Sequence, residues 1–519
     1  MEKNYDYENN DNEGFQREQE SETFPININN IKKLNQINRI NDKKNNFLNK
    51  FWFFIMIFTL SFIIIDSIMK LNKNQKKEKV KFNLNQNNKN NNNENENMSK
   101  EISYKKRDIN EKIGIAFIFE VIYGNGIGRM ISLLTKELSK MNDKYDIYLI
   151  SGQSFHSDFE IDEKIKRIPI YKNKTLIKEF DKTSNVIYYI LHNVLDENEI
   201  KFYQSFNKKI INIMHGSYLS AVYSKCPAVY QLWENNKLFD AFINVVPDDY
   251  YIYKQLELTN TFYIPNLLTF EPSKTPNSNL TYNNLIIMGR ENDPLKGGIY
   301  AIKVMNLIVK EVPDAKLYFI SSDYRIDSIK NLTRDLNLTN NIEFLPYISN
   351  ITHYFLNSSV FIYPSITECF PMAMNEGKAH GVPIVAFNVS YSAPYQKGVI
   401  IVEMFNIEQM AKEAIKLLKN YEYRKMKGTE GKISLNEFSN SETINKWDRL
   451  FSILDKDDTV AYKKLQEYTY EKYYDEEKAK DRLESNYNFG KNYSQEFSCH
   501  SFNDIINPKY IRDIKSCNQ

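Results

Sequence analysis

Short apolar runs alternate with longer stretches of helical period over most of this chain, from about residue 112 to about residue 455. Apolar runs this short are typical of buried strands, and their alternation with helices predicts parallel sheets with helices on both faces. The strands expected in the first set span 112–119, 145–151, 185–191, 208–214 and 240–246.

The alternation restarts near residue 282, after a stretch that contains several proline and serine residues. The pattern therefore predicts an α/β fold with two Rossmann-like domains in tandem, 109–270 and 282–440, and a closing helix at 441–455. The tail at 456–519 is rich in Tyr, Lys and Glu and shows no clear core pattern. The strands expected in the second set span 284–289, 316–322, 342–346, 359–365, 382–387 and 398–403.

The segment before these domains has a different composition. Residues 1–46 are polar and rich in Asn and are expected to be disordered, and 70–108 is expected to be a polar spacer. Between them, the run 51–69 has Asp66 as its only charge and is long enough to nearly cross a bilayer core of about 30 Å. We therefore expect a single transmembrane anchor at 47–69. Six basic residues flank it on each side, so the positive-inside rule does not orient it.

Composition excludes some classes of function. A formal net charge of +2 on 519 residues argues against nucleic acid as the main partner. Four cysteines without a C-x-x-C pair argue against a structural zinc site and a dense disulfide framework. A bridge between Cys499 and Cys517 remains possible if the tail is extracytosolic.

A glycine-containing loop follows the first expected strand. Its sequence, GNGIGR at 124–129, opens a helix, and such loops let backbone amides approach an anion. The spacing is not G-x-G-x-x-G, and the next strand does not end in an acidic residue, which weakens a dinucleotide interpretation. An anion-binding turn and a turn without any ligand both remain open.

Two cations lie on the loop after strand 284–289. Arg290 and Lys296 precede a pair of glycines, and the C-terminal edge of a parallel sheet is where ligands bind in such folds. The loop is therefore a candidate for binding a diphosphate. The alternative is an ordinary solvated loop.

Two glutamates follow strand 359–365. Glu368 lies on the loop, and Pro371 suits the first position of a helix expected at 372–380. The amides at the start of this helix form another potential anion site. Glu376 on the second turn is placed to accept hydrogen bonds from ribose hydroxyls, unless it is simply an exposed helix residue.

The sequences GRENDPLKGG and ECFPMAMNEGKAHGVPIVAF resemble the signature of the retaining glycosyltransferases of family four, which have the GT-B fold. The resemblance extends over about residues 112–455. It implies an enzyme that transfers a sugar from a nucleotide donor, such as a UDP- or GDP-sugar, to a glycan, lipid or protein. No cofactor is expected, and a metal ion is not required, because fixed cations and helix amides can stabilise the departing diphosphate.

The resemblance also implies roles for individual residues. Gly126 would let the backbone approach the diphosphate, Arg290 and Lys296 would bind it, and Glu376 would hold the ribose. Glu368 would face the donor sugar, and His215 would lie near it, although His215 can also be an ordinary strand-end histidine. The backbone amides expected at the sugar and its phosphate are those of Phe370, Met372 and Ala373.

Several positions depart from the family pattern: Asn125, Gly128, Cys369 and Gly377. These departures bear on donor identity more than on activity. With the expected anchor, the sequence predicts a single-pass membrane glycosyltransferase of an endomembrane. The alternative is an inactive relative that serves as a scaffold subunit, against which the joint presence of Arg290, Lys296, Glu368 and Glu376 argues.

Overall fold

The computed structural model describes most of the chain from residue 111 to residue 506. All of these residues belong to one unit of the fold, 106–519. The expected anchor at 47–69 lies outside them, and no helix among the described residues has the length and apolar character needed to span a membrane. The described ranges are 111–122, 125–152, 159–193, 196–219, 234–289, 294–321, 327–348, 350–389, 395–456, 458–472, 474–491 and 502–506.

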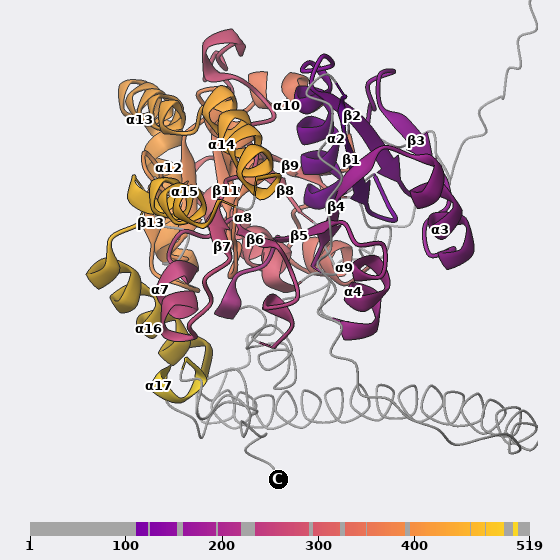
Figure 1. Ribbon diagram of the computed structural model, residues 1–519. Coiled ribbons are helices and arrows are strands. Elements are labelled where there is room, and N and C mark those ends of the chain that lie inside the picture. The colour runs from indigo at the N-terminus through magenta and orange to yellow at the C-terminus, as the bar shows by residue number, and fades with distance from the viewer. Residues whose placement is uncertain are drawn as a thin grey trace, which may run out of the picture. The chain divides into compact units, whose positions relative to one another are not determined.

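The first sheet has seven strands in the order β3-β2-β1-β4-β5-β6-β7 (Figure 1). Every neighbouring pair of strands is parallel, so all the strands end at the same edge. Their bounds are β1 Ile113–Ile118, β2 Tyr145–Ile150, β3 Lys166–Ile168, β4 Val186–His192, β5 Lys209–Met214, β6 Ala241–Asn244 and β7 Thr261–Tyr263.

Alternate side chains of these strands enter two separate cores. On one face they pack against Ile177 of α3 and Ile200 and Tyr203 of α4. On the other they pack against α2, for example through Leu134 and Leu138. The helices that belong to this sheet are α2 Gly126–Ser139, α3 Lys174–Thr183, α4 Glu197–Gln204 and α7 Asp249–Gln255.

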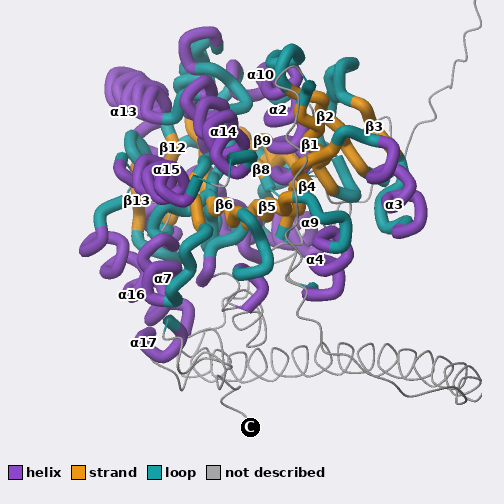
Figure 2. Tube along the Cα trace, in the orientation of Figure 1, coloured by secondary structure: helices purple, strands orange, loops and turns teal. Residues whose placement is uncertain are grey.

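The second sheet has six parallel strands in the order β10-β9-β8-β11-β12-β13. Figure 2 shows the strands of both sheets, in orange, covered by helices, in purple. The strands are β8 Asn284–Met288, β9 Lys316–Ile320, β10 Ile342–Leu345, β11 Val360–Tyr363, β12 Ile384–Phe387 and β13 Ile400–Val402. The helices are α8 Gly298–Glu311, α9 Asp327–Asp335, α10 Thr352–Leu356, α11 Met372–Ala379, α12 Ile407–Lys419 and α13 Tyr421–Ser434. Two parallel sheets with helices on both faces confirm the predicted α/β architecture.

The C-terminal helices return to the first sheet. Trp447 and Phe451 of α14 (Asn440–Leu454) are buried against α2 and the strands, and Leu465 of α15 (Thr459–Glu471) lies in the same core. Leu483 of α16 (Glu476–Lys491) and Phe502 of α17 (Phe502–Ile505) lie in the core on the opposite face. The described part of the region after residue 455 thus supplies core residues, which its sequence pattern did not indicate.

Candidate functional site

The helix α11 carries the second glutamate of the signature and begins nine residues after β11 ends. Gly377 packs this helix onto the sheet, because a Cβ there would lie 2.6 Å from Cδ1 of Phe361. A larger residue would push α11 away from β11. Gly381 follows the helix with a φ of 67°, a left-handed conformation that favours glycine.

Lys296 and Glu368, which were both expected at a donor site, contact each other. The ammonium of Lys296 lies 2.7 Å from Oε1 of Glu368, and the hydroxyl of Tyr363 donates to the same oxygen at 2.7 Å. The Glu368 side chain is 7% exposed and that of Lys296 is 29% exposed, so the cation is the more accessible partner. Burial and the neighbouring Glu368 raise the pKa of Tyr363, which therefore stays protonated and donates this bond.

Gly297, which follows Lys296, lets the loop pack closely enough on the end of β11 for Lys296 to reach Glu368. Gly297 has a φ of 72°, and a Cβ there would lie 2.0 Å from the carbonyl oxygen of Pro364. Only glycine allows the loop to approach the end of β11 so closely. A backbone bond from Ile366 to Leu295, 2.8 Å long, holds the two segments together.

The amides at the start of α11 are partly occupied. Met372 donates its N–H to the carbonyl of Phe370 at 2.9 Å, so a ligand would compete for this amide. Pro371, at the N-cap, contributes no side-chain hydrogen bond. Within the described residues, no partner is found for the amides of Ala373 and Met374, as expected for the first turn of a helix.

The start of α2 lies beside the start of α11. The Oδ1 of Asn125 accepts from the amide of Gly128 at 2.7 Å and caps α2. Gly126 is exposed, and a Cβ there would lie 3.9 Å from Sδ of Met372. The N-termini of two helices, one from each sheet, thus adjoin at this point. Their dipoles both favour an anion.

Arg129, to which the sequence analysis gave no role, connects the two sheets. Its Nη2 donates to the hydroxyl of Tyr347 at 3.3 Å, and its guanidinium lies 4.2 Å from the centre of the Phe159 ring. Burial raises the pKa of Glu376, and the positive charge of Arg129 opposes that rise. Glu376 is 6% exposed, which excludes the alternative of an exposed helix residue. Arg129 is the last residue of the glycine loop GNGIGR, and this position was the one sequence feature that could have marked it as a site residue.

His215 directly follows β5 and contacts a second histidine. Its Nε2 lies 3.0 Å from Nδ1 of His192, and the two rings stack with centroids 5.3 Å apart. Burial lowers the pKa of His215 to about 3, and burial together with His215 lowers that of His192, so both rings are neutral at pH 7. His192 was not predicted, although it ends a strand that neighbours β5.

The remaining predicted residues have different positions. The side chain of Phe370 packs against Tyr395, with ring centroids 4.9 Å apart, so only its backbone is available for a ligand. Arg290 lies outside the described residues. Searching the part of the chain that the structure describes finds no group of three or more His, Cys, Asp or Glu suited to a metal ion.

Residues 271–433 match the family model described as Glycosyl transferases group 1. An uncharacterized glycosyltransferase of Haemophilus influenzae is 29% identical over 156 residues, which cover 29% of this chain and 44% of that protein. The poly(glycerol-phosphate) alpha-glucosyltransferase of Bacillus subtilis is 31% identical over 131 residues, which cover 24% of this chain and 19% of that protein. The chain therefore spans less than half the length of these relatives.

Solved structures resemble the fold at low sequence identity. Sucrose-phosphate synthase from Thermosynechococcus elongatus has a TM-score of 0.57 and 14% identity, covering 66% of this chain and 100% of that one. S. aureus TarM, in complex with fondaparinux, alpha-GlcNAc-glycerol and UDP, has a TM-score of 0.55 and 14% identity, with the same coverage. Anabaena HepE, in complex with UDP and glucose, has a TM-score of 0.53 and 12% identity, covering 65% of this chain and 99% of that one. The described chain thus has a GT-B-like α/β fold with two parallel sheets, and residues 271–433 match the group 1 family model.

Proposed function

We propose that this protein is a retaining glycosyltransferase that moves a sugar from a nucleotide-sugar donor to a glycan, lipid or protein acceptor. The observation that carries the proposal is the meeting of two helix N-termini, at Gly126 beside the first sheet and at Met372 within the residues that match the group 1 model. Lys296 is 29% exposed and contacts Glu368. Glu368 lies on the loop that leads into α11, four residues before Met372. Positive charge and free amides therefore gather where a donor diphosphate would need them.

The charge distribution suits the departure of a diphosphate. Breaking the bond between a sugar and its phosphate leaves negative charge on the phosphate, and preorganised donors stabilise that charge as it develops. We assign this role to Lys296 and to the amide of Ala373, with Arg290 as a further cation. These groups supply positive charge without a metal ion, so we propose a metal-independent reaction.

Retention requires the new bond to form on the face that the phosphate leaves. We propose that the acceptor hydroxyl attacks the anomeric carbon from that face, while its proton passes to the departing phosphate oxygen. Glu368 is held by Lys296 and Tyr363, so it is placed to orient the sugar and not to attack it. His215 is neutral, so it can form a hydrogen bond to a sugar hydroxyl without adding charge.

Two structural neighbours guide the choice of donor. TarM and HepE were both solved with UDP, and HepE also with UDP-glucose. UDP and UDP-sugars are therefore the first probes for this chain. We propose that Glu376 holds the nucleotide ribose, which requires the buried carboxylate to be reached from the side of Arg129.

The N-terminal segment completes the proposal. The run 51–69 has the length and composition of a membrane anchor, and we propose that it attaches the enzyme as a single-pass protein to an endomembrane. The alternative function is an inactive relative that serves as a scaffold subunit. A protein of that kind would not need to bind a nucleoside diphosphate.

Nucleotide binding separates these possibilities. We expect UDP or GDP at millimolar concentration to raise the melting temperature of the full chain by a few degrees, since a ligand at about 100 times its Kd stabilises by about 2.7 kcal/mol. The shift should fall by about half or more in Lys296→Ala, because a tenfold weaker Kd leaves about 1.4 kcal/mol of stabilisation. Lys419→Ala is the matched control, because Lys419 pairs with Glu311 at the same 2.7 Å but is exposed. Absence of any shift with both nucleotides would contradict the proposal.

A further inference from the structure

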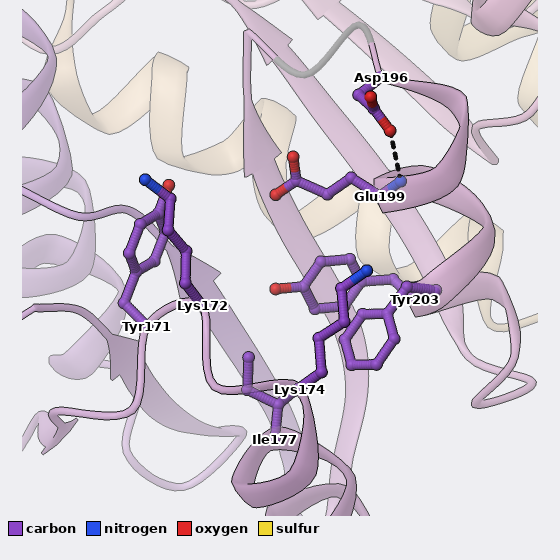
Figure 3. Close-up of a pocket in the computed structure, with 8 residues that line it drawn as sticks. Tyr171, Lys172, Lys174, Ile177, Asp196, Glu199 and Tyr203 are labelled. Atoms are coloured by element: carbon purple, nitrogen blue, oxygen red, sulfur yellow. Dashed lines mark hydrogen bonds between the residues drawn. The ribbon is translucent and has the colours of Figure 1, made fainter. Parts of the chain in front are cut away.

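A pocket of about 280 Å³ opens at the C-terminal edge of the first sheet, between the starts of α3 and α4 (Figure 3). It has room for about nine water molecules at about 30 Å³ each, which is the scale of one small polar molecule. The residues that line it are Tyr171, Lys172, Lys174, Ile177, Asp196, Glu199, Phe202 and Tyr203.

Two polar groups point into this pocket without a protein partner. Tyr203 is 3% exposed, and within the described residues its hydroxyl has no hydrogen bond. The Glu199 carboxylate likewise has no hydrogen bond or ion pair with any described residue. Figure 3 shows both groups directed into the same space, with Tyr171 and Lys172 on its other side. The Tyr203 ring is buried but its hydroxyl opens into the pocket, so a ligand or water there can satisfy it.

The pocket is lined by two cationic and two anionic side chains. Lys172 pairs with Glu120 at 3.0 Å, and Lys174 lies over the Phe202 ring at 5.1 Å. Asp196 and Glu199 add two carboxylates, and an oxygen of Asp196 caps α4 by accepting from the amide of Glu199 at 2.9 Å. Two lysines against two carboxylates give no net attraction for phosphate. The unpartnered carboxylate repels an anion and favours a ligand that donates hydrogen bonds.

The pocket lies along the same sheet edge as the candidate site. Asp196 comes four residues after His192, which contacts His215. Lys172 is bonded to Glu120, which follows β1 and precedes α2. The strands β1 and β4 are neighbours in the sheet. The pocket is therefore joined along one sheet edge to the start of α2, through Glu120 after β1, and to the histidine pair, through His192 at the end of β4.

We propose that this pocket binds one neutral sugar residue of the acceptor, with Glu199 accepting from its hydroxyls and Tyr203 donating to them. A sugar ring offers adjacent donors and acceptors without charge, which matches the unpartnered groups. Tyr171 supplies an apolar face for the ring carbons. The inference rests on the proposed function, because it makes the pocket an acceptor subsite of the transferase.

The test measures saccharide binding by the full chain. Saturation-transfer NMR with methyl glycosides of glucose, galactose, mannose and N-acetylglucosamine should show that at least one of them binds. Tyr203→Phe and Glu199→Gln should each weaken that binding about tenfold. Both changes keep the side-chain shape, and melting temperatures verify folding. Glu197→Gln is the control, because Glu197 lies on the same turn but is exposed and paired with Lys201 at 2.6 Å.

Three outcomes would overturn the inference: no glycoside binds, the variants bind as well as the wild type, or inorganic phosphate displaces the glycoside. UDP stabilisation measured on the same variants keeps the two proposals apart. The pocket inference fails alone if UDP still stabilises the protein while glycoside binding is absent or unaffected by the variants. The proposed function fails if UDP and GDP stabilise neither the wild type nor the variants, whatever the glycosides do.

Discussion

The contact between Lys296 and Glu368 predicts opposite effects for its two members on nucleotide binding. Both side chains were expected to serve a donor, yet in the structure the carboxylate holds the ammonium at 2.7 Å. A donor diphosphate must therefore share Lys296 with Glu368. Glu368→Gln should release the cation and tighten UDP binding, whereas Lys296→Met should weaken it.

The magnitudes follow from charge and exposure. A carboxylate about 6 Å from a bound phosphate costs about 2.8 kcal/mol at an effective dielectric constant of about 20. Because Lys296 is 29% exposed, water screens the interaction, and we reduce this to about 1 kcal/mol, or about fivefold tighter binding in Glu368→Gln. Loss of a charged hydrogen bond in Lys296→Met should cost about 1.5–3 kcal/mol, or at least about tenfold in Kd.

Isothermal titration of UDP into each variant measures these changes directly. The kcat should fall in both variants, because Glu368 is expected to face the sugar and Lys296 the diphosphate. In Lys296→Met the affinity for UDP falls as well, whereas in Glu368→Gln it rises. Glu311→Gln and Lys419→Met form a control pair with the same 2.7 Å contact on the exposed surface, and neither should alter UDP binding. Weaker UDP binding in Glu368→Gln would refute the reasoning, since it would mean that the carboxylate supports the nucleotide.

Three further predictions concern buried polar groups. Asn375 is 3% exposed, and among the described residues neither polar atom of its side chain has a partner, so Asn375→Leu should raise the unfolding free energy by about 1–2 kcal/mol, seen as a higher melting temperature. Burial raises the pKa of Asp249 to about 8 from 3.8, so the native state keeps a proton that the unfolded state loses, and stability falls as pH rises between these values. The melting temperature of Asp249→Asn should therefore decline less between pH 5 and pH 8, and an unchanged slope would contradict this. His192→Phe keeps the stacking on His215 but removes its hydrogen bond, so kcat should fall severalfold with the donor KM unchanged.

The sequence pattern predicted the sheets better than the ends of the chain. Short apolar runs such as the one that became β1, alternating with stretches of helical period, predicted the buried parallel strands. The strands β3 and β7 were not predicted, because their sequences, Lys-Arg-Ile and Thr-Phe-Tyr, contain no continuous aliphatic run. The helices α15 and α16 were also missed, since their apolar residues are mostly tyrosine and leucine dispersed among charges.

The candidate site was predicted as separate loops, and the contacts between them required the structure. Spacing placed Glu368 on a loop and Glu376 on a helix, and α11 confirms the helix. Spacing did not show that Glu368 pairs with Lys296, or that Arg129 connects the sheets, because those contacts join residues that are 72 and 218 positions apart. The His192 contact depended on the strand order, with β4 beside β5.

Nucleotide release from a donor tests the central claim most directly. The full chain is incubated with UDP-glucose, UDP-N-acetylglucosamine, UDP-galactose and GDP-mannose, and the free nucleoside diphosphate is measured with and without a glycan acceptor. We predict that at least one donor is turned over, that acceptor increases the rate, and that Lys296→Ala abolishes it while Lys419→Ala does not. Failure to release nucleotide from any donor, together with no melting shift by UDP or GDP, would contradict the proposal that this chain is a glycosyltransferase.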